Sequence, residues 1–288
     1  MSIASDDGAA SAQAVAAPGR PSEIEAPSNL YLVHPVSRAL VDRLARTAVT
    51  PNQVSAASVL AAGAAATSYV ALPWPLNAFA GLAFQFLWHV LDGADGDLAR
   101  RTGRASPLGE LVDGVCDHVS QGLIYIAFAL MAQRALGGWA WGVAAAAAAS
   151  HFLQANAYET GRKTYRRYVY GAAWMRQAGP SGPGAALARL YLAVSGLVSP
   201  GETAAERALE AVPADPRATL YRAAFRPLIK TSGILDSNTR TLAAFLAVLI
   251  ARPLWFFLFE LTALNLALVG LALWRARVNA ALVRGLTV

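Results

Sequence analysis

The chain contains little cysteine and little charge. Cys116 is the only cysteine among its 288 residues, so no intrachain disulfide can form and a metal cluster built from cysteines is excluded. Charged residues make up 15% of the chain, whereas a soluble domain has about 25%. Hydrophobic residues make up 56% and gather in stretches close to the ~20 residues that a spanning helix needs. This composition predicts an integral membrane protein built from helices.

An apolar core of signal-peptide length is also missing from residues 1–28, which are rich in Ala, Ser, Gly and Pro. We expect these residues to form a disordered tail, followed by a membrane domain over residues 29–288. The formal net charge of +6 does not indicate nucleic-acid binding, because the Arg and Lys residues cluster beside apolar segments. An anionic membrane surface explains such clusters, so no nucleic-acid partner is expected.

The hydropathy pattern predicts an all-α fold, a polytopic membrane bundle of six transmembrane helices preceded by an amphipathic helix in the membrane interface. The interfacial helix is expected over residues 35–50, where apolar and arginine side chains fall on opposite sides. Thr50-Pro51 and Ser106-Pro107 are typical helix starts, a hydroxyl cap followed by a proline. The first four spans are expected at residues 54–72, 76–91, 108–132 and 139–158.

The second half of the chain has a less regular pattern. Residues 175–236 are long and polar, and we expect a cytoplasmic insertion there. Residues 241–273 are apolar but interrupted at Arg252-Pro253, which fits two short spans or one long kinked helix. Two spans agree better with the positive-inside rule, because both ends of the chain are then cytoplasmic. Among the basic residues that flank the spans, only Arg134 and Arg252 then lie outside.

Four aspartates occupy fixed positions in the most informative segment, whose pattern is D-x2-D-G-x2-A-R-x8-G-x3-D-x3-D. Asp92 and Asp95 are three residues apart at the end of the second predicted span, so they share one helix face. Asp113 and Asp117 are four residues apart at the start of the third span and also share a face. The short link over residues 101–105 folds these helices antiparallel, which should bring the four carboxylates together at the cytoplasmic edge.

Such a cluster predicts a cation. Four facing carboxylates cannot all stay ionised in a partly dry site without one, and all-oxygen ligands suit Mg²⁺, Mn²⁺ or Ca²⁺ rather than zinc. Mg²⁺ takes one or two carboxylates plus substrate phosphates, so a pyrophosphate substrate fits. Gly96, Ala99 and Gly109 remove side-chain bulk where a nucleotide would lie against the backbone. Arg100 supplies a planar donor fork for phosphate or cytosine oxygens.

Three other interpretations explain less of the pattern. Solvated helix ends account for one aspartate, but not for four that alternate with small residues on facing helices. A cation or proton transporter also clusters intramembrane carboxylates. These carboxylates lie at one membrane edge, however, and Arg100 and the glycines have no role in ion transport. A non-catalytic scaffold does not need the full carboxylate set.

All eight fixed positions match the signature of the CDP-alcohol phosphotransferase (CDP-alcohol phosphatidyltransferase) family, which the chain resembles over about residues 35–158. Thr50-Pro51-Asn52 also resembles the Pro-Asn element that family members carry before their first span. The resemblance implies a six-helix membrane enzyme of phospholipid biosynthesis, usually a homodimer, that displaces CMP from a CDP-linked alcohol.

Residue by residue, the resemblance implies that Asp92, Asp95 and Asp113 are ligands of Mg²⁺ or Mn²⁺. It makes Asp117 a ligand or near-ligand and also the general base that takes the proton from the acceptor hydroxyl. The side chains and backbone expected to hold the cytidine diphosphate are those of Asn52, Gly96, Ala99, Arg100 and Gly109.

The donor and the acceptor stay open at this point. CDP-diacylglycerol fits a site at the membrane edge, and the alternative is a soluble donor such as CDP-inositol or a lipid alcohol acceptor. Basic residues at the cytoplasmic end of the fourth span either bind a phosphorylated acceptor, such as an inositol or glycerol phosphate, or simply lie beside lipid headgroups. These residues and their neighbours are Tyr158, Glu159, Arg162, Lys163, Arg166 and Arg167. The expected location is a bacterial inner membrane, with the active site facing the cytoplasm.

Four polar residues within the later spans need a separate interpretation. His151 and Gln154, about one helical turn apart, either line the active-site cavity or hydrogen-bond another helix. Glu260 and Asn265 are expected to pack helices together.

Overall fold

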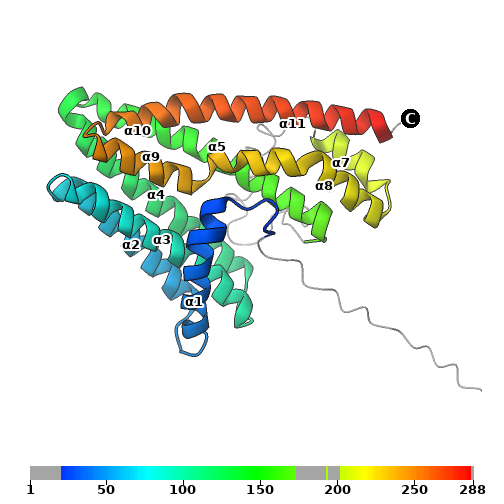
Figure 1. Cartoon of the computed structure of the whole chain (residues 1–288), viewed down its shortest axis with the longest axis horizontal. Coiled ribbons are helices and arrows are strands. Elements are labelled where there is room, and N and C mark those ends of the chain that lie inside the picture. The colour runs from blue at the N-terminus through cyan, green and yellow to red at the C-terminus, as the bar shows by residue number, and fades with distance from the viewer. Residues whose placement is uncertain (1–20, 173–192, 194–201, 287–288) are drawn as a thin grey trace, which may run out of the picture.

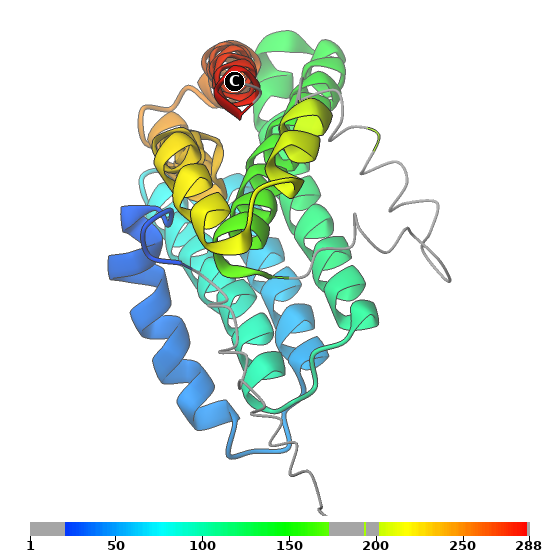
Figure 2. The same ribbon diagram turned by 90° about the vertical axis from the view of Figure 1, so that its right-hand side faces the viewer.

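A computed structural model describes residues 21–172, 193 and 202–286. Every secondary-structure element in this part of the chain is helical, which confirms the all-α prediction (Figures 1 and 2). The predicted insertion lies partly outside the described residues; within them its C-terminal part forms α7 (Glu202–Glu210) and α8 (Ala214–Thr231).

Four long helices make up the first half: α2 (Pro51–Ala71), α3 (Leu76–Arg101), α4 (Pro107–Leu136) and α5 (Trp139–Tyr170). Both predicted helix starts are confirmed. The Thr50 hydroxyl accepts from the backbone N–H of Gln53 at 3.3 Å, and the Gln53 side chain accepts from the N–H of Thr50 at 2.9 Å, which completes a capping box. The Ser106 hydroxyl caps α4 by accepting from the N–H of Gly109 at 3.1 Å.

The interfacial helix is shorter than predicted. Helix α1 (His34–Leu44) ends six residues before the expected boundary at residue 50. The Thr47 hydroxyl donates to the carbonyl of Leu44 at 2.7 Å and accepts from the N–H of Val49 at 3.2 Å, so the chain turns there. Thr50 must then be extended to cap α2. Val41 of α1 is buried against α2 and α3, as expected for the apolar side of an amphipathic helix.

The late apolar stretch is broken where the sequence indicated. Helix α9 (Ser237–Leu249) ends before Arg252-Pro253, and a helical run then continues through α10 (Leu254–Leu258), η3 (Phe259–Leu264) and α11 (Asn265–Leu286). Within the described residues, three helices are long and apolar enough to cross a membrane: Pro51–Ala71, Val112–Leu136 and Leu254–Leu286. They support a helical membrane protein, whereas the count of six spans stays a prediction.

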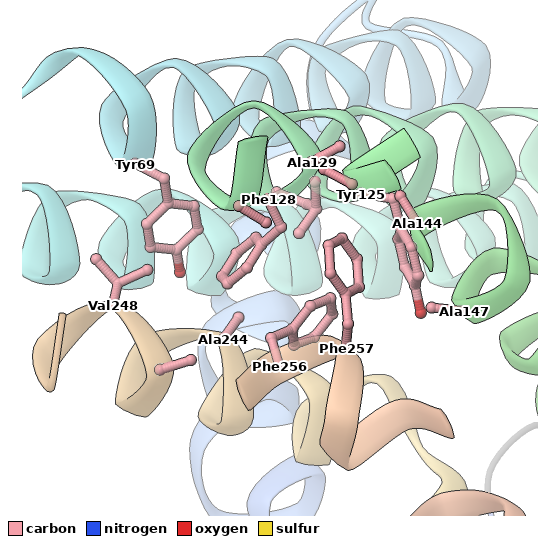
Figure 3. Close-up of a cluster of buried hydrophobic side chains, with 14 of the residues drawn as sticks. Tyr69, Tyr125, Phe128, Ala129, Ala144, Ala147, Ala244, Val248, Phe256 and Phe257 are labelled. Atoms are coloured by element: carbon pink, nitrogen blue, oxygen red, sulfur yellow. The ribbon is translucent and has the colours of Figure 1, made fainter. Parts of the chain in front are cut away.

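An aromatic cluster holds the middle of the bundle together. Tyr69 of α2, Tyr125 and Phe128 of α4, and Phe256 and Phe257 of α10 meet there (Figure 3). The rings of Phe128 and Phe256 are 4.4 Å apart between centroids, and Tyr69 approaches Phe128 edge-on at 5.5 Å. Each ring buries a large apolar area, so the cluster fixes α2 and α4 relative to the last helices.

Residues 21–28 are packed against the protein, so the expected disordered tail of residues 1–28 extends too far. Ile24 is 2% exposed and lies in a second apolar cluster with residues of α5, α7 and α8. The Glu23 carboxylate beside it accepts from the hydroxyls of Tyr165 at 2.8 Å and Tyr170 at 2.7 Å, and from Arg222 at 3.2 Å. These partners lie far along the sequence, which a local pattern cannot indicate.

Gly81 permits a close crossing of α2 and α3. A Cβ atom at this position would lie 2.2 Å from Cε1 of Tyr69, whose ring is buried in the aromatic cluster. We therefore expect Gly81→Ala to lower the free energy of unfolding by about 1–3 kcal/mol through overpacking. Thermal unfolding of the detergent-purified protein measures this effect. Gly142→Ala is the matched control, because nothing lies within 4 Å of a Cβ atom there; equal unfolding temperatures of the two variants would contradict the expectation.

Candidate active site

Three of the four aspartates come together between α3 and α4. One carboxylate oxygen from each of Asp92, Asp113 and Asp117 lies within 4.8 Å of the other two, and all three residues are partly buried. The sequence pattern therefore predicted this meeting of the two helices correctly.

The fourth aspartate, Asp95, is held on the α2 side and is not part of this group. One of its oxygens accepts from the Ser55 hydroxyl at 2.5 Å and the other from the backbone N–H of Gly96 at 2.5 Å. Asp95 is 3% exposed, so its carboxylate is fixed in a buried environment. Its assignment as a metal ligand stays a prediction.

The turn between α3 and α4 places the aspartates of the two helices near one another. The Thr102 hydroxyl donates to the carbonyl of Leu98 at 2.8 Å and ends α3. Gly103 has a φ of 67°, a left-handed conformation that favours glycine. Ser106 then caps α4, as described above. Both helices pack along α2 far more than against each other.

The oxygen group fits a hard divalent cation. Two ligand oxygens on opposite sides of one ion are separated by twice the metal–oxygen distance, which is about 4.2 Å for Mg²⁺ and about 4.8 Å for Ca²⁺. Oxygens within 4.8 Å of one another therefore need little movement to bind one ion. Ionised carboxylates this close also repel one another unless a proton or a cation lies between them. The donor set and its spacing agree with the predicted metal.

The residues predicted to contact the nucleotide lie on α2, α3 and α4. Asn52 is exposed in the first turn of α2, Gly109 is in the first turn of α4, and Ala99 is half-buried near the end of α3. At Gly96, the nearest atom to an added Cβ would be Nη1 of Arg100 at 3.5 Å, so the packing of the protein itself does not require glycine there.

Arg100 makes a contact that the sequence interpretation did not include. Its guanidinium forms an ion pair with Asp97, one turn earlier on α3. Both residues line a hollow at the surface between α1 and α3, together with Arg38, Val41 and Arg101. Binding of a diphosphate by Arg100 would therefore compete with Asp97.

The basic segment beyond residue 158 continues as part of α5, and Arg162 lies among carboxylates. Its guanidinium contacts Glu25 at 2.7 Å and Glu159 at 3.2 Å. Burial raises the pKa of the nearby Asp236 carboxyl to about 6, although the attraction of Arg162 lowers it. A carboxyl with this pKa is mostly ionised at pH 7, so the charge of Arg162 is already compensated. Arg162 therefore does not behave as the open phosphate-binding cation of the acceptor interpretation.

Arg167, one turn further along α5, is also engaged inside the protein. It contacts Glu206 at 3.6 Å and Glu210 at 3.1 Å, both on α7. This part of the basic segment connects α5 to the helical end of the insertion.

The polar residues of the later helices form a packing network. The Gln154 amide donates to Asn265 at 2.9 Å and to the carbonyl of Glu260 at 3.2 Å. Arg240 of α9 lies 3.3 Å from Glu260 and donates to Gln154 at 2.5 Å. His151 contacts the Tyr125 hydroxyl at 3.2 Å. The helix-packing interpretation of Gln154, Glu260 and Asn265 is thus confirmed, whereas the role of Arg240 was missed because its partners are distant in sequence.

Comparisons with known proteins agree with this geometry. Residues 48–199, more than half of the chain, match the family described as CDP-alcohol phosphatidyltransferase. The chain is similar to the bifunctional IPC transferase and DIPP synthase of Thermococcus kodakarensis, with 40% identity over 88 residues, which are 30% of this chain and 18% of that protein. It is also similar to the archaetidylinositol phosphate synthase of Aeropyrum pernix, with 38% identity over 82 residues, 28% of this chain and 40% of that protein. The aligned segments thus span less than half the length of either relative. With three of its four signature aspartates gathered between α3 and α4, the chain belongs to the CDP-alcohol phosphatidyltransferase family.

Proposed function

We propose that this protein transfers a phospho-alcohol group from a CDP-alcohol to the hydroxyl of an acceptor alcohol and releases CMP. The observation that carries the proposal is the meeting of three signature carboxylates, those of Asp92, Asp113 and Asp117, between α3 and α4. The family match supports the same chemistry. Purified protein with a CDP-alcohol, Mg²⁺ or Mn²⁺ and a panel of acceptors tests the proposal by release of CMP.

Asp92, Asp113 and Asp117 are the residues that would hold Mg²⁺ or Mn²⁺, with Asp95 beside them. A bound divalent ion neutralises charge on the pyrophosphate oxygens and makes CMP a better leaving group. Residues of the protein position the donor. Gly96 leaves space next to the aspartates, and Arg100 can exchange its contact with Asp97 for a phosphate oxygen.

Asp117 is the proposed general base. Its carboxylate takes the proton from the acceptor hydroxyl while the acceptor oxygen forms a bond to the phosphorus that carries the donor alcohol. The bond from that phosphorus to the oxygen of the CMP phosphate breaks, and CMP leaves with both bonding electrons. The product is a phosphodiester that joins the two alcohols.

The donor that we propose is CDP-diacylglycerol, because the aspartates lie in the halves of α3 and α4 nearest the turn that joins them, as expected for a site near a membrane edge. A soluble donor such as CDP-inositol, or a lipid alcohol acceptor, is the second candidate.

One relative is named as an archaetidylinositol phosphate synthase, which favours an inositol phosphate over a glycerol phosphate as the acceptor. The phosphate contacts that we propose for such an acceptor lie in the basic segment at the end of α5, which contains Lys163 and Arg166.

We further propose that the turn between α3 and α4 faces the cytoplasm and that the protein works as a homodimer. The cytoplasmic orientation is supported by the arginines near this turn, among them Arg100, Arg101 and Arg104. The bacterial inner membrane stays a prediction for the location.

A cation or proton transporter is the rival function from another class. Two observations favour the enzyme. The aspartates lie in the halves of α3 and α4 nearest the turn that joins these helices, and the family match covers them.

Removal of the metal gives a direct test. We expect CMP release to stop in excess chelator and to return when Mg²⁺ or Mn²⁺ is added, because clustered carboxylates otherwise have no counter-charge to position the pyrophosphate. The measurement is the initial rate of CMP formation at increasing free metal. Full turnover in excess chelator would show that the proposed chemistry is wrong.

A further inference from the structure

We propose that Ser55 is a positioning residue of the active site, which fixes the orientation of the Asp95 carboxylate toward the bound cation. Ser55 is not part of the eight-position signature and has no assigned role. The inference rests on the proposed function, because it concerns the metal that the aspartates would hold.

The contact between the two side chains is short and buried. The Ser55 hydroxyl lies 2.5 Å from Oδ2 of Asp95, and both residues are 3% exposed. The same hydroxyl lies 3.2 Å from the carbonyl of Pro51, but it has a single proton, and the carboxylate is the closer and charged acceptor. Ser55 therefore donates to Asp95.

The start of α2 determines where this hydroxyl lies. The capping box of Thr50 and Gln53 fixes the first turn of the helix, and Ser55 follows in the next turn. Val54, its neighbour in sequence, is buried in the cluster with Ala94 of α3, the neighbour of Asp95. The two helices are thus packed together at this level, so the hydroxyl has little freedom to leave the carboxylate.

The contact has a consequence for the metal centre. Because Oδ1 of Asp95 accepts from the N–H of Gly96 and Oδ2 from the Ser55 hydroxyl, the carboxylate has a fixed orientation, one helical turn from Asp92 on α3. Without the hydroxyl, Oδ2 would be a buried oxygen without its donor, and the carboxylate would rotate. Groups that orient ligands in this way typically change metal affinity by about 10- to 100-fold when they are removed.

Three substitutions at this position separate the hydroxyl from the packing. Ser55→Thr keeps the hydroxyl, Ser55→Val has the shape of threonine without it, and Ser55→Ala removes it with the least change in volume. Ser58→Ala is the matched control, since Ser58 is a buried serine of the same helix whose hydroxyl donates only to the backbone carbonyl of Ser55, at 2.7 Å.

The test is Mn²⁺ binding to the detergent-purified full chain, measured by electron paramagnetic resonance, with CMP release at increasing Mg²⁺ as a second readout. We expect Ser55→Ala and Ser55→Val to weaken Mn²⁺ binding about 10- to 100-fold, whereas Ser55→Thr and Ser58→Ala stay within a few-fold of the wild type. If Ser55 only stabilised the fold, its substitutions would lower the unfolding temperature without this difference in Mn²⁺ affinity between the variants.

Equal Mn²⁺ affinity in the threonine and valine variants would overturn the inference, even if the alanine variant failed to fold. Failure of the proposed function gives a different result: the wild-type protein would bind Mn²⁺ but release no CMP from any CDP-alcohol. The effect of Ser55 on Mn²⁺ binding would then still be measurable.

Discussion

CMP release is expected to fall by roughly 100- to 10,000-fold when Asp117 is replaced by asparagine, while binding of the donor stays nearly intact. Asparagine keeps the size of the side chain and an oxygen atom, but it cannot accept the proton of the acceptor hydroxyl. Asp113→Asn is the informative comparison. Asp113 lies one turn closer to the turn between α3 and α4 and belongs to the same oxygen group. If Asp113 is mainly a ligand, its replacement by asparagine should weaken metal binding and donor binding together.

Calorimetry of donor binding, run beside turnover for both variants, distinguishes the two roles. Asp42→Asn serves as the control for removing a negative charge, because Asp42 is an exposed residue of α1 that pairs with Arg101. Such surface pairs contribute about 0–1 kcal/mol, so this variant should keep its activity. If Asp113→Asn and Asp117→Asn lost donor binding equally, Asp117 would be one more ligand, and the base would have to be another group.

The second large effect concerns stability. Replacing Glu260 with alanine should lower the free energy of unfolding by about 3–5 kcal/mol, because it leaves the charge of Arg240 buried without its carboxylate. The Arg240 side chain is 3% exposed and that of Glu260 is 0% exposed. Arg240 also donates to the carbonyl of Leu235 at 2.5 Å and to Gln154 at 2.5 Å, so it cannot easily turn toward solvent.

Thermal or detergent-induced unfolding of the purified protein measures this loss. The double variant Arg240→Met with Glu260→Leu removes both charges together and should recover most of the stability, since a buried ion pair is worth little more than apolar packing of similar volume. A double variant as unstable as Glu260→Ala would indicate that shape rather than charge is essential at these positions.

Local signals were sufficient for some features of the fold and not for others. Thr50 and Ser106 were recognisable as helix starts because a cap depends on the next few residues only. The end of α5 was not recognisable from the sequence, because the extension of this helix from residue 158 to Tyr170 is stabilised by packing against α7 and α8. The end of α1 was misplaced because the hydrogen bonds of Thr47 compete with helical ones.

In the aspartate site, too, local spacing predicted some contacts and missed others. Its helical spacing placed Asp92 opposite Asp113 and Asp117, because two helices joined by a short turn must face each other. The spacing could not indicate that Asp95 bonds to Ser55, which is 40 residues away on another helix. The neutralisation of Arg162 by Glu25 was hidden for the same reason, with 137 residues between them.

The packed segment over residues 21–28 has a consequence for the order in which the protein acquires its structure during synthesis. Glu23 and Ile24 precede the helices of the described bundle in the sequence, yet Arg222, a partner of Glu23, follows 199 residues later. Domains fold as they emerge from the ribosome, and a contact with so large a sequence separation can form only when its second half exists. Glu23 and Ile24 therefore reach their final position late, after α8 has been translated.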